Sequence, residues 1–473
     1  MLWFRKEGIW PRLVVITAVL VVVIAAPAVS SAEQPQPDTE VLTLVKALGL
    51  AREEHPLVRA AQLSLDSSEL ALTRSEAAYA PKLSLSSRPL VTRNGEVEIS
   101  LADSLTVTGS LSTPQGLGLS ASNRWEGESR ERRGLTVRAE LQLWPPARYN
   151  AGNLNLLAAE EALDLTGYQL QQAREEAVID IYSRYRTLQI DAARLKLQEE
   201  EYQAKLAAYE RVVGKAEQGL ASAVEVLAAR QAVEESLAEY QRAQREYRLK
   251  LKTFLADLSL EEGTWELEPL PETLTLPGVD ISLEEAIAMA LEADVTLLEQ
   301  RQNLKAAQRQ LEAARTANGF EVNLSASVSF SEDQQGDDYR AYLSFSYPLL
   351  DGGSRRLAVE EAELSLRRAE EAVVKRRSEL SREVEHMLSE IQYLADKVKI
   401  ANLNYEKTAL EHNAKVLQAA NGLIPESEAR ESQRLLAGAK LSWFEAAVAL
   451  EKARLELRMM TGQVMDVEGG DPN

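Results

Sequence analysis

The chain contains the same sequence plan twice. In its second half, a helical pattern over residues 282–318 gives way to short alternating segments and then to a longer helical pattern, and the first half has the same order. Pro348 lies 203 residues after Pro145, and Gly422 lies 203 residues after Gly219. A repeat of this kind means that one supersecondary unit is used twice, so it constrains the fold before any local assignment.

Each copy contains short segments in which apolar residues alternate with small polar ones. Residues 321–330 and 341–347 show this pattern in the second copy, and residues 135–143 show it in the first. Strands of about ten residues with one apolar and one polar face are typical of the wall of a water-filled membrane barrel. On this interpretation the lipid-facing residues are Val322, Leu324, Val328, Phe330, Leu343 and Phe345, and the pore-lining residues are Ser325, Ser327, Ser329, Arg138 and Glu140. The simpler interpretation of the last two is an ion pair in the lumen.

The long helical segments carry a narrow apolar seam. In the second copy the seam consists of Val384, Met387, Leu388, Ile391, Leu394, Ala395 and Val398, which follow coiled-coil spacing. A helix of about 65 residues is about 100 Å long at 1.5 Å per residue. A single helix of that length cannot bury its seam. We therefore expect neighbouring helices from the same chain or from other subunits.

The expected organisation has two structural repeats and three shorter segments. These are a signal peptide (1–32), a flexible leader (33–39), a first repeat (40–258, with strands within 82–144 and long helices over 153–258), a linker (259–281), a second repeat (282–461, with strands within 321–347 and long helices over 354–461) and a disordered tail (462–473).

The N-terminus is typical of a secretory signal. Arg5, Lys6 and Arg12 precede the apolar stretch 13–26, and small residues follow up to Ala32. The apolar stretch is shorter than the roughly 20 residues that a membrane-spanning helix needs. This favours cleavage after export over retention as an uncleaved anchor.

The composition excludes several classes of function. The chain has no cysteine, and its three histidines, His55, His386 and His412, are far apart in the sequence. Disulfides and thiol catalysis are therefore excluded, and we predict a protein that is not an enzyme, with no catalytic, cofactor-binding or metal-binding residues. The net charge of −20 at pH 7 would repel a phosphate backbone, so no nucleic-acid partner is expected.

One chain supplies too few strands to close a pore. The alternating segments predict roughly four to six strands, whereas the smallest membrane barrels use about eight. Closure therefore requires a ring of identical subunits. In such a ring the helices would continue the pore as a hollow cylinder. No segment after the N-terminus is apolar enough for a spanning helix, so membrane entry would require a closed barrel.

Five short motifs stand at residues 283–291 (LEEAIAMAL), 348–353 (PLLDGG), 219–227 (GLASAVEVL), 54–56 (EHP) and 80–85 (APKLSL). With these motifs the chain resembles, over almost its whole length after the N-terminal segment, the outer-membrane efflux factors of the TolC type, the outer membrane efflux protein family. None of these motifs is diagnostic alone. Their order, spacing and duplication together are specific.

The resemblance implies an α+β membrane protein. Its duplicated helix–strand–strand–helix repeat would form a trimeric transmembrane β-barrel of twelve strands, four from each subunit, continued by a long periplasmic α-helical barrel. The implied function is an outer-membrane channel, the exit duct of a tripartite efflux or type I secretion system. The implied partners are two further copies of the chain, a periplasmic membrane-fusion adaptor, an inner-membrane pump and outer-membrane lipid. The alternative from the residues alone is a secreted or membrane-anchored coiled-coil scaffold without transport activity.

The two copies differ where strands return to helices. The predicted barrel-to-helix junction consists of Trp144, Pro145, Pro348, Asp351, Gly352 and Gly353. The second copy has Pro-Leu-Leu-Asp-Gly-Gly here and the first has Trp-Pro-Pro, so we expect the two junctions to be built differently. The two glycines lack the Lys-Ser/Thr of a phosphate loop, and we interpret them as a link between strand and helix.

The first strand block is longer than the second. Pro145 lies 64 residues after Pro81, whereas Pro348 lies 28 residues after Phe320. The extra length leaves room for an additional hairpin or a long external loop, which bears on the implied four strands per subunit.

Two glycines end the long helices before the chain turns back. The predicted adaptor-contact tips are Gly219, Leu220, Ala221 and Ser222 in the first copy and Gly422, Leu423 and Ile424 in the second. Glycine is the usual cap at a helix C-terminus, so a plain helix turn is one interpretation. The duplication, and the use of such tips for docking in the family, support the other.

Overall fold

The structure is a computed structural model that describes residues 40–87, 90–93, 96–100, 105–126, 131–261, 265–271, 281–330 and 338–463. The predicted signal peptide, the leader and residues 464–473 lie outside the described residues.

The first copy begins with two consecutive helices, α1 (Leu44–Glu54) and α2 (Pro56–Glu76). Pro56 starts α2 because its fixed φ suits the first helical turn, where its missing N–H would be unpaired in any case. The ring of His55 caps the same helix, since its Nδ1 accepts a hydrogen bond from the Leu57 N–H at 3.3 Å.

The second copy repeats this pair as α5 (Leu283–Ala293) and α6 (Val295–Ala317). Ser282 and Glu285 form a capping box at the start of α5, in which each side chain accepts from the other residue's backbone N–H. Asp294 caps α6 through its carboxylate. The two copies therefore build equivalent helix pairs with different capping residues.

Each copy ends in a helical hairpin. The four helices are α3 (Ala151–Glu217), α4 (Ala223–Asp257), α7 (Ser354–Ala420) and α8 (Glu426–Met460). α3 and α7 both have 67 residues, and α4 and α8 both have 35. The 203-residue repeat therefore extends to the lengths of the hairpin helices. A short 3₁₀ turn, η1 (Ala147–Tyr149), precedes α3.

Six strands form one antiparallel sheet in the order β10-β9-β7-β6-β5-β2. Their bounds are β2 (Lys82–Ser87), β5 (Leu105–Ser112), β6 (Leu117–Glu126), β7 (Glu131–Trp144), β9 (Glu321–Phe330) and β10 (Asp338–Ser346). A separate hairpin pairs β3 (Leu90–Arg93) with β4 (Glu96–Ser100). The pairing of β7 with β9 joins the two copies in one sheet.

The strand number corrects one implication of the family resemblance. The resemblance implies four strands per subunit, but the sheet contains six. The second copy supplies two of them, β9 and β10, as expected. The longer strand block of the first copy supplies four, so its extra length forms strands of the same sheet as well as the β3–β4 hairpin.

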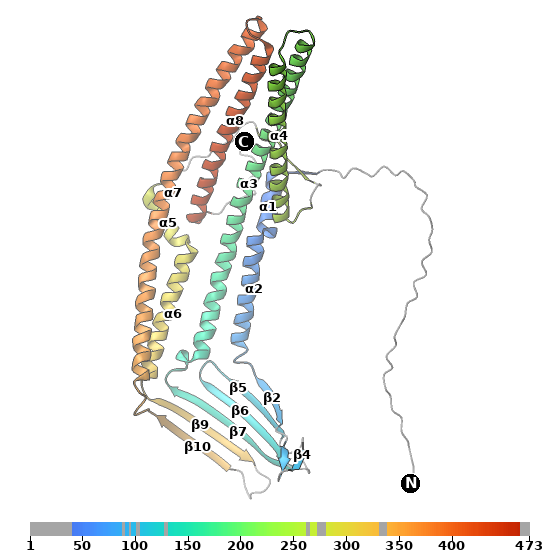
Figure 1. Ribbon diagram of the computed structural model, residues 1–473. Coiled ribbons are helices and arrows are strands. Elements are labelled where there is room, and N and C mark those ends of the chain that lie inside the picture. The colour runs from blue at the N-terminus through green and yellow to red at the C-terminus, as the bar shows by residue number, and fades with distance from the viewer. Residues whose placement is uncertain are drawn as a thin grey trace, which may run out of the picture. The chain divides into compact units, whose positions relative to one another are not determined.

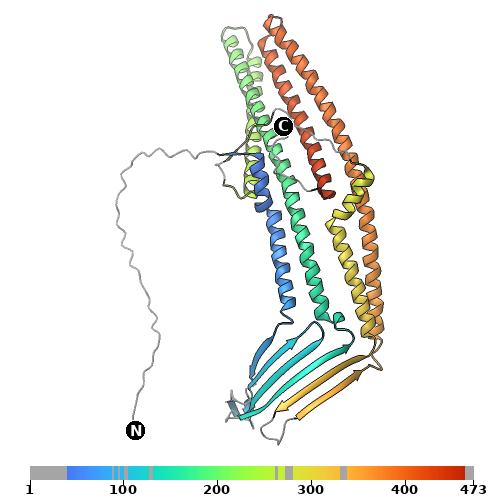
Figure 2. The same cartoon turned by 180° about the vertical axis from the view of Figure 1, so that it is seen from behind.

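The sheet adjoins one end of a row of four helices. α2, α3, α6 and α7 lie side by side in that order in two opposite views (Figures 1 and 2), and each contacts the next. Arg309 of α6 and Glu161 of α3 form an ion pair across the junction of the two copies, with Arg309 Nη1 at 2.9 Å from Glu161 Oε1. Along the chain, α2 and α6 each lead into the strands of their copy, and α3 and α7 each follow them.

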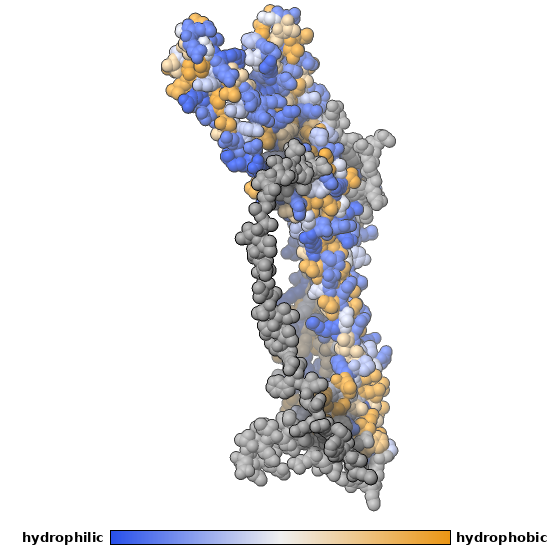
Figure 3. Space-filling model, turned by 90° about the vertical axis from the view of Figure 1, so that its right-hand side faces the viewer, coloured by the Kyte–Doolittle hydropathy of each residue, from blue (hydrophilic) through white to orange (hydrophobic). Residues whose placement is uncertain are grey.

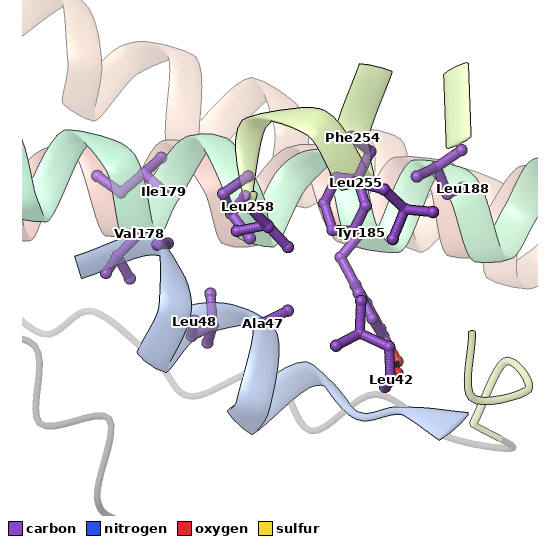
Figure 4. Close-up of a cluster of buried hydrophobic side chains, with 12 residues drawn as sticks. Leu42, Ala47, Leu48, Val178, Ile179, Tyr185, Leu188, Phe254, Leu255 and Leu258 are labelled. Atoms are coloured by element: carbon purple, nitrogen blue, oxygen red, sulfur yellow. Dashed lines mark hydrogen bonds between the residues drawn. The ribbon is translucent and has the colours of Figure 1, made fainter. Parts of the chain in front are cut away.

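One apolar cluster packs α1, α3 and α4 together (Figure 4). Tyr185 of α3 is fully buried in it and donates a hydrogen bond to the carbonyl of Leu42 at 2.7 Å. Leu42 ends the short strand β1 (Glu40–Leu42), which pairs in parallel with β8 (Trp265–Leu267) from the segment between the copies. The start of the first copy and the link to the second are thereby held against the same helix.

The predicted seam of the second copy is confirmed as a helix–helix interface. Ile391 of α7 is buried with Leu450, Ala453 and Leu457 of α8, and Met387, Leu388, Leu394, Ala395 and Val398 pack against this cluster. Val384 is buried at the adjoining contact with α5. The neighbours that the seam requires come from the same chain.

Candidate functional site

The first tip lies between α3 and α4. Gly219 has φ 74°, a conformation that glycine adopts without strain. Its N–H donates to the Ala216 carbonyl at 2.9 Å, and the Leu220 N–H donates to the Lys215 carbonyl at 2.8 Å. These are the two bonds of a Schellman cap. Ser222 then caps the start of α4, so both helix ends at this tip are satisfied within the chain.

The second tip, between α7 and α8, has the same geometry. Gly422 has φ 69°, and its N–H donates to the Ala419 carbonyl at 3.0 Å. The Leu423 N–H donates to the Gln418 carbonyl at 2.9 Å. Pro425 takes the place of a polar capping residue at the start of α8.

Both tips expose an apolar side chain that their caps do not require. Leu220 is 73% exposed and Leu423 is 75% exposed. Three further apolar side chains near the tips are exposed and were not part of the sequence-based prediction: Val224, Leu227 and Leu417. Hydrophobic residues also appear among hydrophilic ones at the ends of the helical hairpins in Figure 3. Apolar groups at an exposed turn are suited to contact with another protein.

The first junction is built around polar side chains. Asn153, in the first turn of α3, donates to the carbonyls of Ala147 at 2.6 Å and Pro114 at 2.8 Å and accepts from the Tyr79 hydroxyl at 2.6 Å. Trp144 stacks on Phe320, with ring centroids 6.2 Å apart. The junction thus connects the segment after α2, the β5–β6 turn, the end of β7 and the start of β9.

The second junction uses a carboxylate instead. Asp351 accepts hydrogen bonds from the N–H groups of Gly353 at 2.9 Å and Arg355 at 3.1 Å. These bonds lower the pKa of the Asp351 carboxyl below its ordinary value. Gly352 and Gly353 both have positive φ, of 67° and 83°, which explains two consecutive glycines here. The two junctions therefore differ in chemistry, as the sequence predicts.

The register gives the sheet one largely apolar face, on which Asn123 is a polar residue between Val107 and Leu135. Val328 lies between Val137 and Tyr339, and Leu324 lies between Leu141 and Leu343. Directly paired residues of neighbouring strands are on the same face. The same face continues through the first-copy residues Leu83, Leu85, Leu105, Val107, Leu111, Leu117, Leu119, Ala121, Leu135 and Ala139. Phe330 and Phe345 complete it in the second copy.

The opposite face is polar. Ser327 lies between Arg138 and Arg340, and Ser329 lies between Thr136 and Asp338. Glu140 pairs with Ser325 on one side. All predicted pore-lining residues therefore share one face, and all predicted lipid-facing residues share the other.

Val322 and Ser325 are more buried than we expect for residues that face lipid or the pore. Val322 is 8% exposed because its register neighbours, Trp144 and Phe345, are both aromatic. Ser325 is 5% exposed between Glu140 and Tyr342, whose side chains are much larger. Their neighbours, and not these two residues, present the surface of the sheet at those positions.

Two of the three histidines, His55 and His412, take part in separate, local contacts. His55 Nε2 lies 3.4 Å from Asp180 Oδ2 beside a cavity of about 510 Å³ that Arg184 and Asp257 also line. These charges are paired with one another, since Arg184 contacts both carboxylates. His412 Nδ1 lies 2.8 Å from Ser432 Oγ. Among the residues that the structure describes, no group of three or more potential ligands is placed to hold a metal ion.

Within the described part of the chain, no helix combines the length and apolarity needed to cross a membrane. Residues 286–463 match the family model described as Outer membrane efflux protein. This match covers nearly all of the second repeat. No curated protein matches the chain in a sequence search.

The two repeats together have the fold of several solved outer-membrane channels. The CmeC outer membrane channel of Campylobacter jejuni matches with a TM-score of 0.63 and 14% identity, over 90% of this chain and 87% of that chain. The outer membrane protein VceC of Vibrio cholerae matches with a TM-score of 0.61 and 15% identity, over 89% and 96%. The open-state MtrE outer membrane channel of Neisseria gonorrhoeae matches with a TM-score of 0.59 and 15% identity, over 94% and 98%.

Proposed function

We propose that this chain is the outer-membrane channel of a tripartite efflux or type I secretion system. Three copies form a pore that conducts substrates passively to the exterior, while the energy comes from an inner-membrane pump. The β-sheet lies in the outer membrane and the helices extend into the periplasm. The chain has no catalytic task in this role.

The two-faced sheet carries the proposal. Its apolar face extends across all six strands, and its opposite face carries serine, threonine and charged side chains. In a membrane barrel the first would contact lipid and the second water. A soluble β-domain would instead need a second layer over the apolar face. On that face Leu83, Leu343 and Phe345 are exposed.

The two helix tips are the surfaces where the periplasmic adaptor docks. Leu220 and Leu423 project from equivalent turns, and each turn is already held by its own backbone hydrogen bonds. Docking therefore requires no refolding of the tip. The apolar side chains around each glycine supply the area that an adaptor covers.

Cell fractionation separates this function from that of a scaffold. The channel should be found in the outer membrane as a trimer that withstands mild detergent and dissociates on heating. A scaffold should be recovered from the soluble fraction, or from membranes as a monomer released without detergent. Recovery in the soluble fraction would contradict the proposal.

A further inference from the structure

We propose that every subunit contributes six strands to the barrel, so that three copies close an eighteen-stranded barrel in which β2 of one copy pairs with β10 of the next. The inference rests on the trimer of the proposed function. It adds the strand number, the edges that close the ring and the width of the pore.

The sheet has two edges that need partners. In the sheet as described, β2 and β10 each pair with a neighbour on one side only. A strand edge in lipid leaves backbone N–H and C=O groups without water or any other hydrogen-bond partner. Open edges therefore do not occur in the hydrocarbon region. A second copy of this chain supplies the missing partner for each edge.

Strand direction permits this closure. Neighbouring strands of the sheet are antiparallel throughout, and the number of strands is even. The two edge strands consequently run in opposite directions. β2 leads away from α2, and β10 leads back to α7. Pairing between β2 of one copy and β10 of the next is therefore antiparallel, like every other pair in the sheet.

The faces of the edge strands also match. Leu83 and Leu85 lie on the apolar face of β2, and Leu343 and Phe345 lie on the apolar face of β10. All four side chains are exposed. The apolar faces of neighbouring copies join in the closed barrel if odd-numbered residues of β2 pair with odd-numbered residues of β10. A slip of one residue would turn serines toward lipid, which fixes the parity of the register.

Six strands and the row of four helices cover arcs of similar length around the barrel. Six strands about 4.8 Å apart and tilted by about 40° cover about 38 Å of a barrel's circumference. Four helices packed side by side at 8–10 Å cover about 32–40 Å. Four strands would cover only about 25 Å. The row α2, α3, α6 and α7 therefore matches the arc of six strands.

The outer helices of the row carry matching apolar positions. Leu63 and Leu70 of α2 are exposed and seven residues apart, and Leu357 and Leu364 of α7 are exposed with the same spacing. Residues seven apart lie on one face of a helix. When β2 pairs with β10 of the next copy, α2 comes beside α7 of that copy and these leucines can be buried between them.

Cysteine cross-linking of the full-length trimer in its membrane tests the closing pair. The chain has no native cysteine, so every disulfide arises from introduced residues. Ser84→Cys is combined with Tyr342→Cys, Ser344→Cys or Ser346→Cys in three double variants. All four positions are on the polar face, and the three partners cover neighbouring registers of the same parity. We expect one pair to give covalent dimers and trimers on oxidation, since its Cα atoms fall within about 4.4–6.8 Å.

Two matched controls give the opposite expectation. Ser84→Cys with Leu343→Cys places the thiols on opposite faces and should stay uncross-linked. Ser120→Cys with Ser344→Cys tests a barrel of four strands per chain, in which β6 would be the edge next to β10. In the six-stranded sheet Ser120 lies between Ser110 and Arg138 and cannot reach another subunit. Intersubunit cross-linking of Ser120→Cys with Ser344→Cys would overturn the inference.

A measurement on the unmodified trimer covers the case in which a double variant fails to assemble. For strands about 4.8 Å apart at a tilt of about 40°, eighteen strands give a barrel diameter of about 36 Å and twelve give about 24 Å. Electron cryo-microscopy of the purified trimer distinguishes these values. A conducting trimer with the smaller diameter would leave the channel function intact and refute the strand number alone.

Discussion

Arg376 of α7 donates two parallel hydrogen bonds to the carboxylate of Asp294, the capping residue of α6. Arg376 Nε lies 3.1 Å from Asp294 Oδ1, and Arg376 Nη2 lies 2.8 Å from Asp294 Oδ2. The same carboxylate accepts from the Leu297 N–H at the start of α6. Both side chains are largely buried, at 19% and 13% exposed. The pair therefore connects the junction between α5 and α6 to the long helix α7.

Replacing Arg376 with glutamine should destabilise the second repeat by about 2–4 kcal/mol. The change leaves the Asp294 carboxylate partly buried without its charged partner. The matched control is Arg356→Gln, which removes an exposed pair with Glu360 and should cost about 1 kcal/mol or less. Thermal unfolding followed by circular dichroism measures both. Equal losses in the two variants would show that the buried pair has no special role.

Tyr185 should make stability depend on alkaline pH. Burial raises the pKa of the Tyr185 phenol from 10 to about 12. The folded state therefore favours the neutral phenol, so its contribution is fully present below about pH 10 and is lost as the pH rises toward 12. Two pKa units correspond to about 2.7 kcal/mol.

Tyr185→Phe isolates this contribution. The variant loses the hydrogen bond to the Leu42 carbonyl, at a cost of about 1–2 kcal/mol at neutral pH. Between pH 10 and 12 its stability should fall less than that of the wild type, because the variant lacks the buried phenol. Some loss should remain in both proteins, since their other tyrosines still titrate. Parallel pH profiles of the two proteins would contradict the burial of the phenol.

An arginine should be tolerated on one face of β9 and not on the other. Val328→Arg places a charge on the apolar face, at a cost of roughly 2–4 kcal/mol near the bilayer midplane, and should reduce the amount of trimer in the membrane. Ser329→Arg is the matched control on the polar face, beside Thr136 and Asp338. Ser327 is less suitable, because it lies between Arg138 and Arg340. The amount of trimer in extracted outer membranes measures the effect, and equal yields would refute the assignment of faces.

Charging both tips should abolish docking without affecting assembly. Leu220→Asp combined with Leu423→Asp places two carboxylates into an apolar contact, where burial without a partner is unfavourable. Because both leucines are exposed, the trimer and its thermal stability should be unchanged. Cross-linking to the adaptor and export should be lost, whereas the double methionine variant should retain both. Export at the wild-type level by the aspartate variant would exclude the tips as the docking surface.

The periodic features of this fold could be predicted from the sequence. The seam from Val384 to Val398 is a local pattern, and its burial against α8 follows from coiled-coil spacing. The two-faced strands are equally local, because a strand's alternation decides which residues share a face. The 203-residue repeat gave the order of helices and strands in both copies.

Features that depend on distant neighbours could not be predicted. Val322 and Ser325 owe their burial to the large residues opposite them on β7 and β10, which the sequence of β9 does not contain. The sequence does not predict a single strand number, because the first strand block is only partly alternating. Gly109 and Gly118 fall on β5 and β6, where they interrupt the pattern that marks the strands of the second copy.

Single-channel recording from the purified trimer in planar bilayers tests the central claim most directly. A channel formed by the polar face of the sheet should give discrete, long-lived conductance steps, and a charge-reversing Glu140→Lys variant should shift its ion selectivity toward anions. Val328→Arg protein should give few insertions. A stable trimer or monomer that never conducts, or one whose selectivity is unchanged by the charge at position 140, would contradict the proposed pore.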